Sequence, residues 1–358
     1  MIKNKVLIFS HEFPPFGGGA GVVAYQYCIE LNKQGNDVTL LTRHQNIFPK
    51  DLKGINIITV PHIPKLWFIP YYFKLKKINL TQFDSIILND IVSGFVAGKY
   101  FNQNILNKCA PILHGSEPEN IYNQPSIYFK IIKFKNYYNK MLDSSRKIIA
   151  VSNYMKEKFL SQTTFKNDKK IEVVYSGLSD DFFIEKEVNC KDIFEYKNKE
   201  IILTVSRIEK DKGFLDMYEV FKTLIKKDDT FIWIIVGDGK FKIEFENTVL
   251  KDKLESKVIF KGKTPRNELY KYYKCADVFW LLSKYKESFG LVYLEAQAYG
   301  CPAVGYNRYG VKEAIEDKKT GFLVDKASDS LEVFLKRKYK KLLVKNIKDF
   351  ALMFKSKK

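Results

Sequence analysis

Cysteine and histidine are scarce in this sequence. Its 358 residues include only four histidines and five cysteines. The cysteines are scattered, odd in number and form no C-x-x-C pair: Cys28, Cys109, Cys190, Cys275 and Cys301. This spacing argues against a disulfide framework and against a zinc site, and it fits a reducing cytoplasm.

Long hydrophobic runs are also missing. The N-terminus starts with basic residues, but its apolar run from Val6 to Phe9 is shorter than the roughly 7–15 residues of a signal peptide. No window approaches the roughly 18 residues of a membrane span. The longest candidate, LWFIPYYF at 66–73, contains a proline. The sequence therefore predicts a soluble or peripheral protein whose first apolar run is a β-strand.

Acidic residues are outnumbered by basic ones. The chain has 60 Lys and Arg against 41 Asp and Glu, a net charge of +19. This excess suits nucleic acid, an anionic membrane surface or a phosphate-bearing substrate, and charge alone does not distinguish them. A hydrophobic fraction of 46% and an aromatic fraction of 15% exclude a disordered or collagen-like chain.

Short apolar runs alternate with helix-like stretches along most of the chain. Seven such runs occupy residues 5–10, 37–42, 55–60, 85–90, 110–115, 147–152 and 171–177. Six more follow a polar interval, at 200–206, 231–237, 257–262, 277–283, 301–306 and 320–325. The alternation predicts two α/β domains with parallel sheets. We place them at 1–178 and 200–330, with a linker at 179–199 and a basic helical tail at 331–358.

The first candidate site is the glycine cluster PPFGGGAG at 14–21. Glycines allow close backbone approach to a ligand, and a following helix N-terminus favours anions. A dinucleotide fingerprint is a poor match, because the glycines trail the strand and the next strand ends in Thr42-Arg43 rather than in an acidic residue. The alternative is an ordinary strand-to-helix loop.

Three further motifs follow strands. In SRIEKDKG at 206–213, Arg207 and Lys212 suit a diphosphate, although the segment alone would also read as a solvated turn. In ESFGLVYLE at 287–295, a helix starting near Gly290 would offer amides to an anion and place a carboxylate one turn on, where it could hold a ribose diol. LHGSE at 113–117 puts His114 at a strand end, which predicts that it faces a ligand site; the alternative is a structural role, as for most lone histidines.

Taken in order, these motifs resemble the retaining glycosyltransferases of family 4, which have the GT-B fold. The resemblance rests on PPFGGGAG, LHGSE, VSRIEKDKG, VGDG and above all ESFGLVYLEAQAYGCPAVG, and it covers about residues 5–325. It implies an α/β fold of two Rossmann-like domains with parallel sheets, facing each other across a cleft. It also implies that the second domain holds a nucleotide sugar and the first the acceptor.

The resemblance transfers the family's residue roles to matching positions. Arg207 and Lys212 would neutralise the departing diphosphate. Glu287 would face the transferred sugar and Glu295 the ribose. His114 would contact the donor sugar and help to stabilise its developing positive charge. Further donor contacts are implied for Gly18, Gly19, Gly21, Gly237, Lys263, Thr264, Ser288, Phe289, Gly290, Leu291 and Val292.

The same resemblance sets expectations for the reaction. The donor is a UDP- or GDP-linked sugar, used as substrate, and the acceptor is a glycan or a polyprenyl-linked glycan. No Asp-x-Asp pair stands at a strand end, so we expect neither a metal nor another cofactor, with Arg207 and Lys212 in place of the cation. The sequence departs from the family at Ser176, Leu282 and Ser288, and at Tyr309, which stands in place of a glycine before Gly310. The last lies in a loop that often touches the donor sugar, so the donor remains open.

Two alternatives use the same features differently. A non-hydrolysing nucleotide-sugar epimerase would share the two-domain fold, but ESFGLVYLE together with Arg207 and Lys212 fits the transferase pattern better. A binding protein without catalysis would act through charge on nucleic acid or a membrane. No nucleic-acid motif is present, so we expect no nucleic-acid partner.

The positive charge is concentrated in three windows. Residues 336–358 contain ten Lys or Arg and one Asp, and the acid-free stretches 52–83 and 120–142 contain five and four lysines. Residues 61–77 mix aromatics with lysines as interfacial segments do, or form an ordinary core-plus-surface helix. We therefore expect a cytoplasmic protein in peripheral contact with the anionic inner face of a membrane. A composition rich in Lys, Asn, Ile, Phe and Tyr indicates a low-GC bacterial genome. By association we expect a role in surface polysaccharide synthesis, of capsule, O-antigen or lipopolysaccharide.

Overall fold

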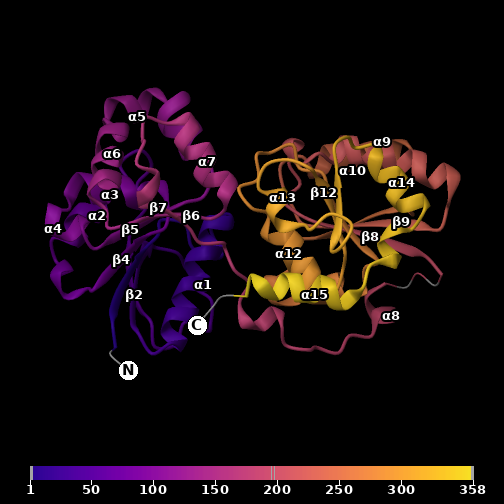
Figure 1. The fold of residues 1–358 in the computed structure, drawn as a ribbon, viewed down its shortest axis with the longest axis horizontal. Helices are drawn as coiled ribbons and strands as arrows, with labels where there is room; N and C mark the ends of the chain where they lie inside the picture. Colours follow the sequence, from indigo (N-terminus) through magenta and orange to yellow (C-terminus); the bar gives the residue numbers. More distant parts are fainter. Residues whose placement is uncertain (1–2, 195, 197, 356–358) are drawn as a thin grey trace. The chain divides into compact units, whose positions relative to one another are not determined.

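The structure is a computed structural model, and it describes residues 3–194, 196 and 198–355. The chain divides into two compact units, the first ending at Ser176 and the second beginning at Gly177 (Figure 1). Within the described residues each unit is built on one parallel sheet. Among the described helices none is long and apolar enough to cross a membrane.

The first unit has a seven-stranded sheet in the order β3-β2-β1-β4-β5-β6-β7, and its neighbouring strands are parallel. Its strands are β1 (Lys5–Phe9), β2 (Asp37–Arg43), β3 (Asn56–Val60), β4 (Ser85–Leu88), β5 (Cys109–Leu113), β6 (Ile148–Ala150) and β7 (Ile171–Val173). Its helices are α1 (Gly19–Lys33), α2 (Phe68–Leu75), α3 (Ile91–Tyr100), α4 (Gln103–Leu106), α5 (Ile127–Ile131), α6 (Phe134–Ser144) and α7 (Asn153–Gln162). The central strands are buried because helices cover the sheet, as parallel sheets require.

The second unit has a six-stranded sheet in the order β10-β9-β8-β11-β12-β13, again with parallel neighbours. Its strands are β8 (Glu200–Val205), β9 (Phe231–Val236), β10 (Val258–Gly262), β11 (Val278–Leu281), β12 (Ala303–Tyr306) and β13 (Gly321–Val324). Its helices are α8 (Cys190–Ile193), α9 (Phe214–Lys227), α10 (Lys242–Lys251), α11 (Leu269–Cys275), α12 (Leu291–Ala298), α13 (Val311–Ala314), α14 (Asp329–Leu335) and α15 (Val344–Met353). Trp233 and Trp280 lie fully buried in its core.

The predicted strands are confirmed in both units, although most end one to four residues earlier than predicted. The strand order reverses beside β1 in the first unit and beside β8 in the second. In doubly wound sheets, ligands bind beyond the carboxyl ends of the strands at such a switch point. We therefore expect ligand sites at the loops that follow β1, β4, β8 and β11.

The segment predicted as a linker, 179–199, belongs to the second unit, which begins at Gly177, although much of the segment is exposed. Leu178, Phe182 and Phe194 are buried in that unit's core. Residues 195 and 197 lie outside the described residues. The sequence did not predict this packing, because the apolar side chains of the segment are widely spaced among lysines and acids.

The basic tail is helical, as predicted, and it too packs on the second unit. α15 runs beside α12 (Figure 1), and the side chains of Phe334, Tyr339 and Ala351 are buried. Several of its cations are paired: Arg337 with Asp228 at 2.9 Å, Lys338 with Glu332 at 3.0 Å, and Lys340 with Glu200. Part of the tail's charge is thus neutralised within the unit, which the sequence window did not reveal.

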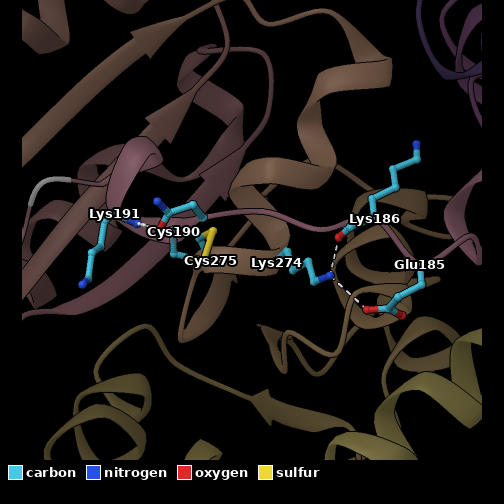
Figure 2. The surroundings of a disulfide bond; sticks show 7 residues. Glu185, Lys186, Cys190, Lys191, Lys274 and Cys275 are labelled. Carbon is cyan, nitrogen blue, oxygen red and sulfur yellow. Dashed lines mark hydrogen bonds and ion pairs between the residues drawn. A yellow bond between two sulfur atoms is a disulfide. The ribbon is translucent and has the colours of Figure 1, made fainter.

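The expectation that no cysteines pair is wrong. Cys190 and Cys275 form a disulfide, with their Cα atoms 5.3 Å apart (Figure 2). They are 85 residues apart in the sequence and carry no spacing signal. They meet because α8 packs against α11. Cys28, Cys109 and Cys301 are free and buried.

Candidate active site

The loops that follow β8 and β11 pack directly on each other. Gly213 ends the first loop with φ +78°, and a Cβ on it would lie 2.0 Å from the carbonyl oxygen of Leu282. Only glycine fits this approach. Lys284 and Tyr285 donate their backbone N–H groups to the carbonyl of Asp211 at 2.8 and 3.0 Å. The side chains on the two loops are therefore held close together.

This packing joins two of the predicted site residues. Lys212 Nζ lies 2.6 Å from Glu287 Oε1, and only 11% and 18% of the two side chains is exposed. The Lys212 ammonium also lies 5.0 Å from the ring centre of Tyr285. Because the pair is shielded from water, each charge depends on the other.

Arg207 is placed differently. It is exposed and, with five neighbours, lines an open pocket of about 540 Å³. The other lining residues are Glu209, Lys210, Asp211, Lys240 and Phe241. The pocket lies at the carboxyl end of β8, where the sequence predicted a diphosphate contact. Lys212 is not among its lining residues, and its ammonium is held by Glu287 instead.

The predicted helix start at ESFGLVYLE is confirmed. α12 begins at Leu291, and Gly290 before it has φ +100°. Phe289 is buried, whereas Ser288, Leu291 and Val292 are half-buried. The loop after β12 packs against this turn, because Gly310 donates its N–H to the carbonyl of Glu287 at 2.9 Å.

Tyr309 precedes Gly310 in that loop and has φ +58°. This left-handed backbone suits the glycine that the family commonly has there. The departure noted in the sequence therefore keeps the backbone of the loop and adds a tyrosine side chain.

Glu295 is held by two residues that the sequence did not suggest. Arg266 Nη2 donates to Oε1, and the hydroxyl of Tyr273 donates to Oε2 at 3.0 Å. Glu295 is only 3% exposed, and burial together with this carboxylate raises the pKa of Tyr273 well above its usual value. Tyr273 is therefore a protonated donor. The sequence predicted neither α11 nor the partner of its tyrosine.

His114 belongs to a polar network in the first unit. Its Nε2 lies 3.2 Å from Oδ1 of Asn89, whose amide group donates to Ser10 Oγ and to the carbonyl of Ala20, each at 2.9 Å. Because Oδ1 can only accept, His114 is protonated on Nε2. Burial lowers the pKa of His114 to about 4, so the ring is neutral at physiological pH.

Two buried carboxylates organise the loops around that histidine. Glu117 accepts the N–H groups of His114 and Gly115, each at 2.7 Å. Asp90 accepts the N–H groups of His11 at 2.5 Å and of Ser93 at 2.8 Å. Both residues were visible in the sequence as polar groups after an apolar run, but nothing there showed that they bind backbone amides.

The glycine cluster gives a mixed result. Gly18 donates its N–H to Glu12 Oε2 at 2.9 Å, so a carboxylate already occupies an amide of the predicted anion loop. A Cβ on Gly21 would lie 3.3 Å from backbone atoms of Phe13 and Phe16. On Gly19 it would meet no described atom within 4 Å. The described structure therefore gives no packing reason for glycine at position 19.

The remaining predicted donor contacts lie after β9 and β10. Gly237 has φ +147°, and a Cβ on it would lie 1.9 Å from the carbonyl oxygen of Ser206, so packing alone requires glycine there. Lys263 is exposed and Thr264 half-buried. No group of three or more His, Cys, Asp or Glu in the described part of the chain is arranged to hold a metal ion.

Comparison with known proteins assigns both units. The family model "Glycosyltransferase Family 4" matches residues 17–182, and "Glycosyl transferases group 1" matches residues 185–347. The chain is 24% identical over 327 residues to the N-acetyl-alpha-D-glucosaminyl L-malate synthase of Bacillus anthracis, covering 87% of this chain and 81% of that protein. It is 29% identical over 192 residues to CapM of Staphylococcus aureus, a capsular polysaccharide biosynthesis glycosyltransferase, covering 50% and 48% of the two chains.

Solved structures agree on the fold. The structure of Anabaena HepE in complex with UDP-glucose superposes with a TM-score of 0.79 at 17% identity, over 98% of this chain and 96% of that one. At this identity the likeness establishes the two parallel-sheet Rossmann-like units of GT-B proteins. Together with the two family models it leads to one assignment: the chain belongs to glycosyltransferase family 4 and is a glycosyltransferase of the GT-B type.

Proposed function

We propose that this glycosyltransferase moves a sugar, with retention of configuration, from a nucleoside-diphosphate sugar to a glycan or lipid-linked glycan acceptor. The observation that carries the proposal is the shielded pair of Lys212 and Glu287 at the switch point of the second sheet. A diphosphate arriving there competes with the carboxylate for the ammonium. The carboxylate then becomes available to the hydroxyls of the transferred sugar.

The charge balance of the reaction explains why a cation is needed. Breaking the bond between the sugar and the diphosphate leaves negative charge on the leaving oxygen and positive charge on the sugar ring. Lys212 would neutralise the leaving group, with Arg207 reaching it from the neighbouring pocket. The half-buried, neutral His114, whose Nε2–H is donated to Asn89, would accept a hydrogen bond from a sugar hydroxyl without adding a positive charge to it. We propose that the protein's own cations serve in place of a metal.

The remaining predicted contacts would fix the donor. The N–H groups at the start of α12, from Phe289 to Val292, would bind an anionic or hydroxyl oxygen. Glu295 would hold the ribose. Gly19, which has room beside it, would let the backbone approach the substrate, whereas Gly18 would do so only if the Glu12 carboxylate moved.

The relatives support a choice of substrates. HepE is described in complex with UDP-glucose, and CapM is described in capsular polysaccharide biosynthesis. We therefore propose a UDP-linked donor ahead of a GDP-linked one, and a role in bacterial surface polysaccharide synthesis. We also propose that the protein works at the cytoplasmic face of a membrane, in peripheral contact with anionic lipid, where a lipid-linked acceptor would lie.

A donor panel tests the proposal. The purified protein is incubated with UDP- and GDP-sugars, with and without a polyprenyl-linked or glycan acceptor, and release of nucleoside diphosphate is measured. We expect release that depends on the acceptor, and its loss in both Lys212→Ala and Glu295→Ala. Unchanged release in both variants would show that the site is elsewhere. Isomerisation of the donor without acceptor would instead indicate an epimerase.

A further inference from the structure

Residues 178–194, here called the anchored segment, are fixed to one helix at several points. The disulfide joins Cys190 to Cys275 at the end of α11 (Figure 2). Beside it, Lys274 donates to the carboxylate of Glu185 at 2.9 Å and to the backbone carbonyl of Lys186. The ring of Phe194 lies 6.0 Å from that of Tyr272, centre to centre. These contacts hold the segment along α11.

The same helix and the turn before it hold the carboxylate of Glu295. Tyr273 lies on α11, and Arg266 lies three residues before its start. The anchored segment reaches Arg266 directly, because the guanidinium lies 5.4 Å from the ring centre of Phe182, a cation–π distance. A continuous set of contacts within the second unit thus links the disulfide to Glu295.

The hydrogen bonds of Glu295 leave it able to bind a diol. Each carboxylate oxygen can accept two hydrogen bonds, and the structure gives each oxygen one donor, Arg266 on Oε1 and Tyr273 on Oε2. Tyr273 is fully buried, whereas 32% of the Arg266 side chain is exposed. Glu295 itself is only 3% exposed, and of its two donors only Arg266 reaches the surface, so a ligand that meets the carboxylate would meet it beside that guanidinium.

We propose that Arg266, held by the disulfide-anchored segment 178–194, is a positioning residue that orients Glu295 toward the ribose hydroxyls of the donor. This inference rests on the proposed function, which makes Glu295 the ribose contact. It adds that the covalent state of Cys190 and Cys275 controls the contact. When the disulfide is reduced, the anchored segment no longer holds Phe182 against Arg266, and Glu295 loses its orientation.

The disulfide is open to chemical control. Cys190 is exposed and Cys275 is half-buried. Lys274 precedes Cys275 but directs its ammonium to Glu185 and to the carbonyl of Lys186 (Figure 2). Exposed disulfides are the ones that thiols reduce. A dithiol breaks the bond in two exchanges, leaves Cys190 and Cys275 as two thiols, and is itself oxidised to a cyclic disulfide. In the reducing cytoplasm, where we propose that the protein works, the weaker-binding reduced form would therefore prevail, and oxidation would raise the affinity for the donor.

The test compares nucleotides that differ only in the ribose hydroxyls. Affinities for UDP and GDP and for their 2′,3′-dideoxy forms are measured by calorimetry on the full chain, oxidised and after treatment with dithiothreitol. For the nucleotide that binds, we expect the oxidised protein to prefer the ribose form at least tenfold. Reduction, Cys190→Ser and Arg266→Met should each lower this preference to threefold or less, while affinity for the dideoxy form stays unchanged. Arg266→Lys should restore part of the preference.

Controls separate positioning from simple loss of structure. Dithiothreitol should not change nucleotide binding by Cys190→Ser, and Lys191→Ala should behave like the unaltered protein. The proposal is overturned if the preference for the ribose form over the dideoxy form survives both reduction and Arg266→Met. It is also overturned if the ribose form and the dideoxy form lose affinity equally. If neither nucleoside diphosphate binds the oxidised protein, the proposed function fails. If reduction leaves the amide exchange of residues 269–275 unchanged, the disulfide does not fix the anchored segment to α11, and that part of the proposal fails separately.

Discussion

Lys212 and Glu287 are 75 residues apart in the sequence, yet Nζ of the first lies 2.6 Å from Oε1 of the second. The pair depends on Gly213, whose missing side chain lets the two loops approach, and on the β8 and β11 strands, which end side by side. Its two members have different expected partners in the reaction, the diphosphate and the sugar. Their effects on stability and on catalysis should therefore separate.

The first prediction uses that separation. Lys212→Met leaves the shielded Glu287 carboxylate without its partner and should destabilise the protein by on the order of 3 kcal/mol. It should also lower the rate of sugar transfer by roughly 10²–10³, the loss typical of one charge-stabilising donor. The double variant Lys212→Met/Glu287→Gln should regain most of the stability but none of the rate. Denaturant unfolding and acceptor-dependent diphosphate release measure the two effects, and recovery of both would mean that the pair is structural.

The second prediction concerns pH. Burial lowers the pKa values of His114 and His11 to about 4, below the usual 6.5. Between pH 6.5 and 4 the unfolded chain binds more protons at these histidines than the folded chain does, so their contribution to stability should rise with pH across this window, by up to about 3 kcal/mol for each histidine. Burial raises the pKa values of Asp90 and Glu117, and these carboxyls act in the opposite direction. Unfolding in urea at pH 4.5, 5.5 and 7 should therefore show a smaller rise, or a steeper fall, of stability with pH in His114→Asn than in the unaltered protein. An equal slope in that variant would contradict the prediction.

Both sheets could be predicted from the sequence, because apolar β-rich runs bounded by turns are a local signal. The start of α12 at Leu291 was predictable for the same reason, since Gly290 marks it. The pairing of Glu295 with Arg266 was not, because it depends on how α11 packs against α12. The disulfide between Cys190 and Cys275 was missed for a related reason: its two ends come together only after the anchored segment has packed.

The polar network of the first unit could be predicted only in part. Asn89 and His114 both follow apolar runs, so their place at the sheet's carboxyl edge could be predicted. The carboxylate of Glu12 against the N–H of Gly18 could not, because it requires the loop to fold back on itself. Patterns locate side chains along a sheet edge, whereas hydrogen-bond partners depend on loop conformation.

The third prediction concerns the metal. If Lys212 and Arg207 neutralise the diphosphate, dialysis against EDTA should leave the initial rate within twofold, and added Mg²⁺ or Mn²⁺ should not raise it further. The assay is diphosphate release from the donor selected by the panel. A rate that falls at least tenfold with EDTA and returns with one divalent ion would contradict it and would assign charge neutralisation to that ion.

The fourth prediction concerns donor choice. Tyr309 has a left-handed backbone, so Tyr309→Gly should be accommodated without backbone change and should not lower the melting temperature by more than a few degrees. The loop packs against Glu287, the residue expected to face the sugar. We therefore expect the variant to change the ratio of kcat/KM between two nucleotide sugars by about tenfold, roughly 1.4 kcal/mol. Identical ratios would place the tyrosine away from the donor.

The last prediction concerns the membrane. Part of the segment 61–77 forms helix α2, and its aromatic side chains take part in packing. Trp67 and Phe68 contact Phe95 and are half-buried. Replacing Trp67, Phe68 and Tyr72 by serine would therefore disturb packing as well as any lipid contact. A cleaner surface lies on α5, where Ile127 and Ile131 are 77% and 73% exposed.

This surface also carries the charge expected of a lipid contact. Lys130 and Lys133 are exposed beside the two isoleucines, and the hydroxyl of Tyr128 donates to the carbonyl of Lys65, which joins α5 to the start of the 61–77 segment. The double variant Ile127→Ser/Ile131→Ser should lose at least tenfold in binding to phosphatidylglycerol vesicles, with its melting temperature unchanged, because it removes only exposed apolar area. Leu250→Ser, an exposed leucine of the second unit, is the matched control. Binding that is equal in all three proteins, or as strong to phosphatidylcholine vesicles, would rule out this surface.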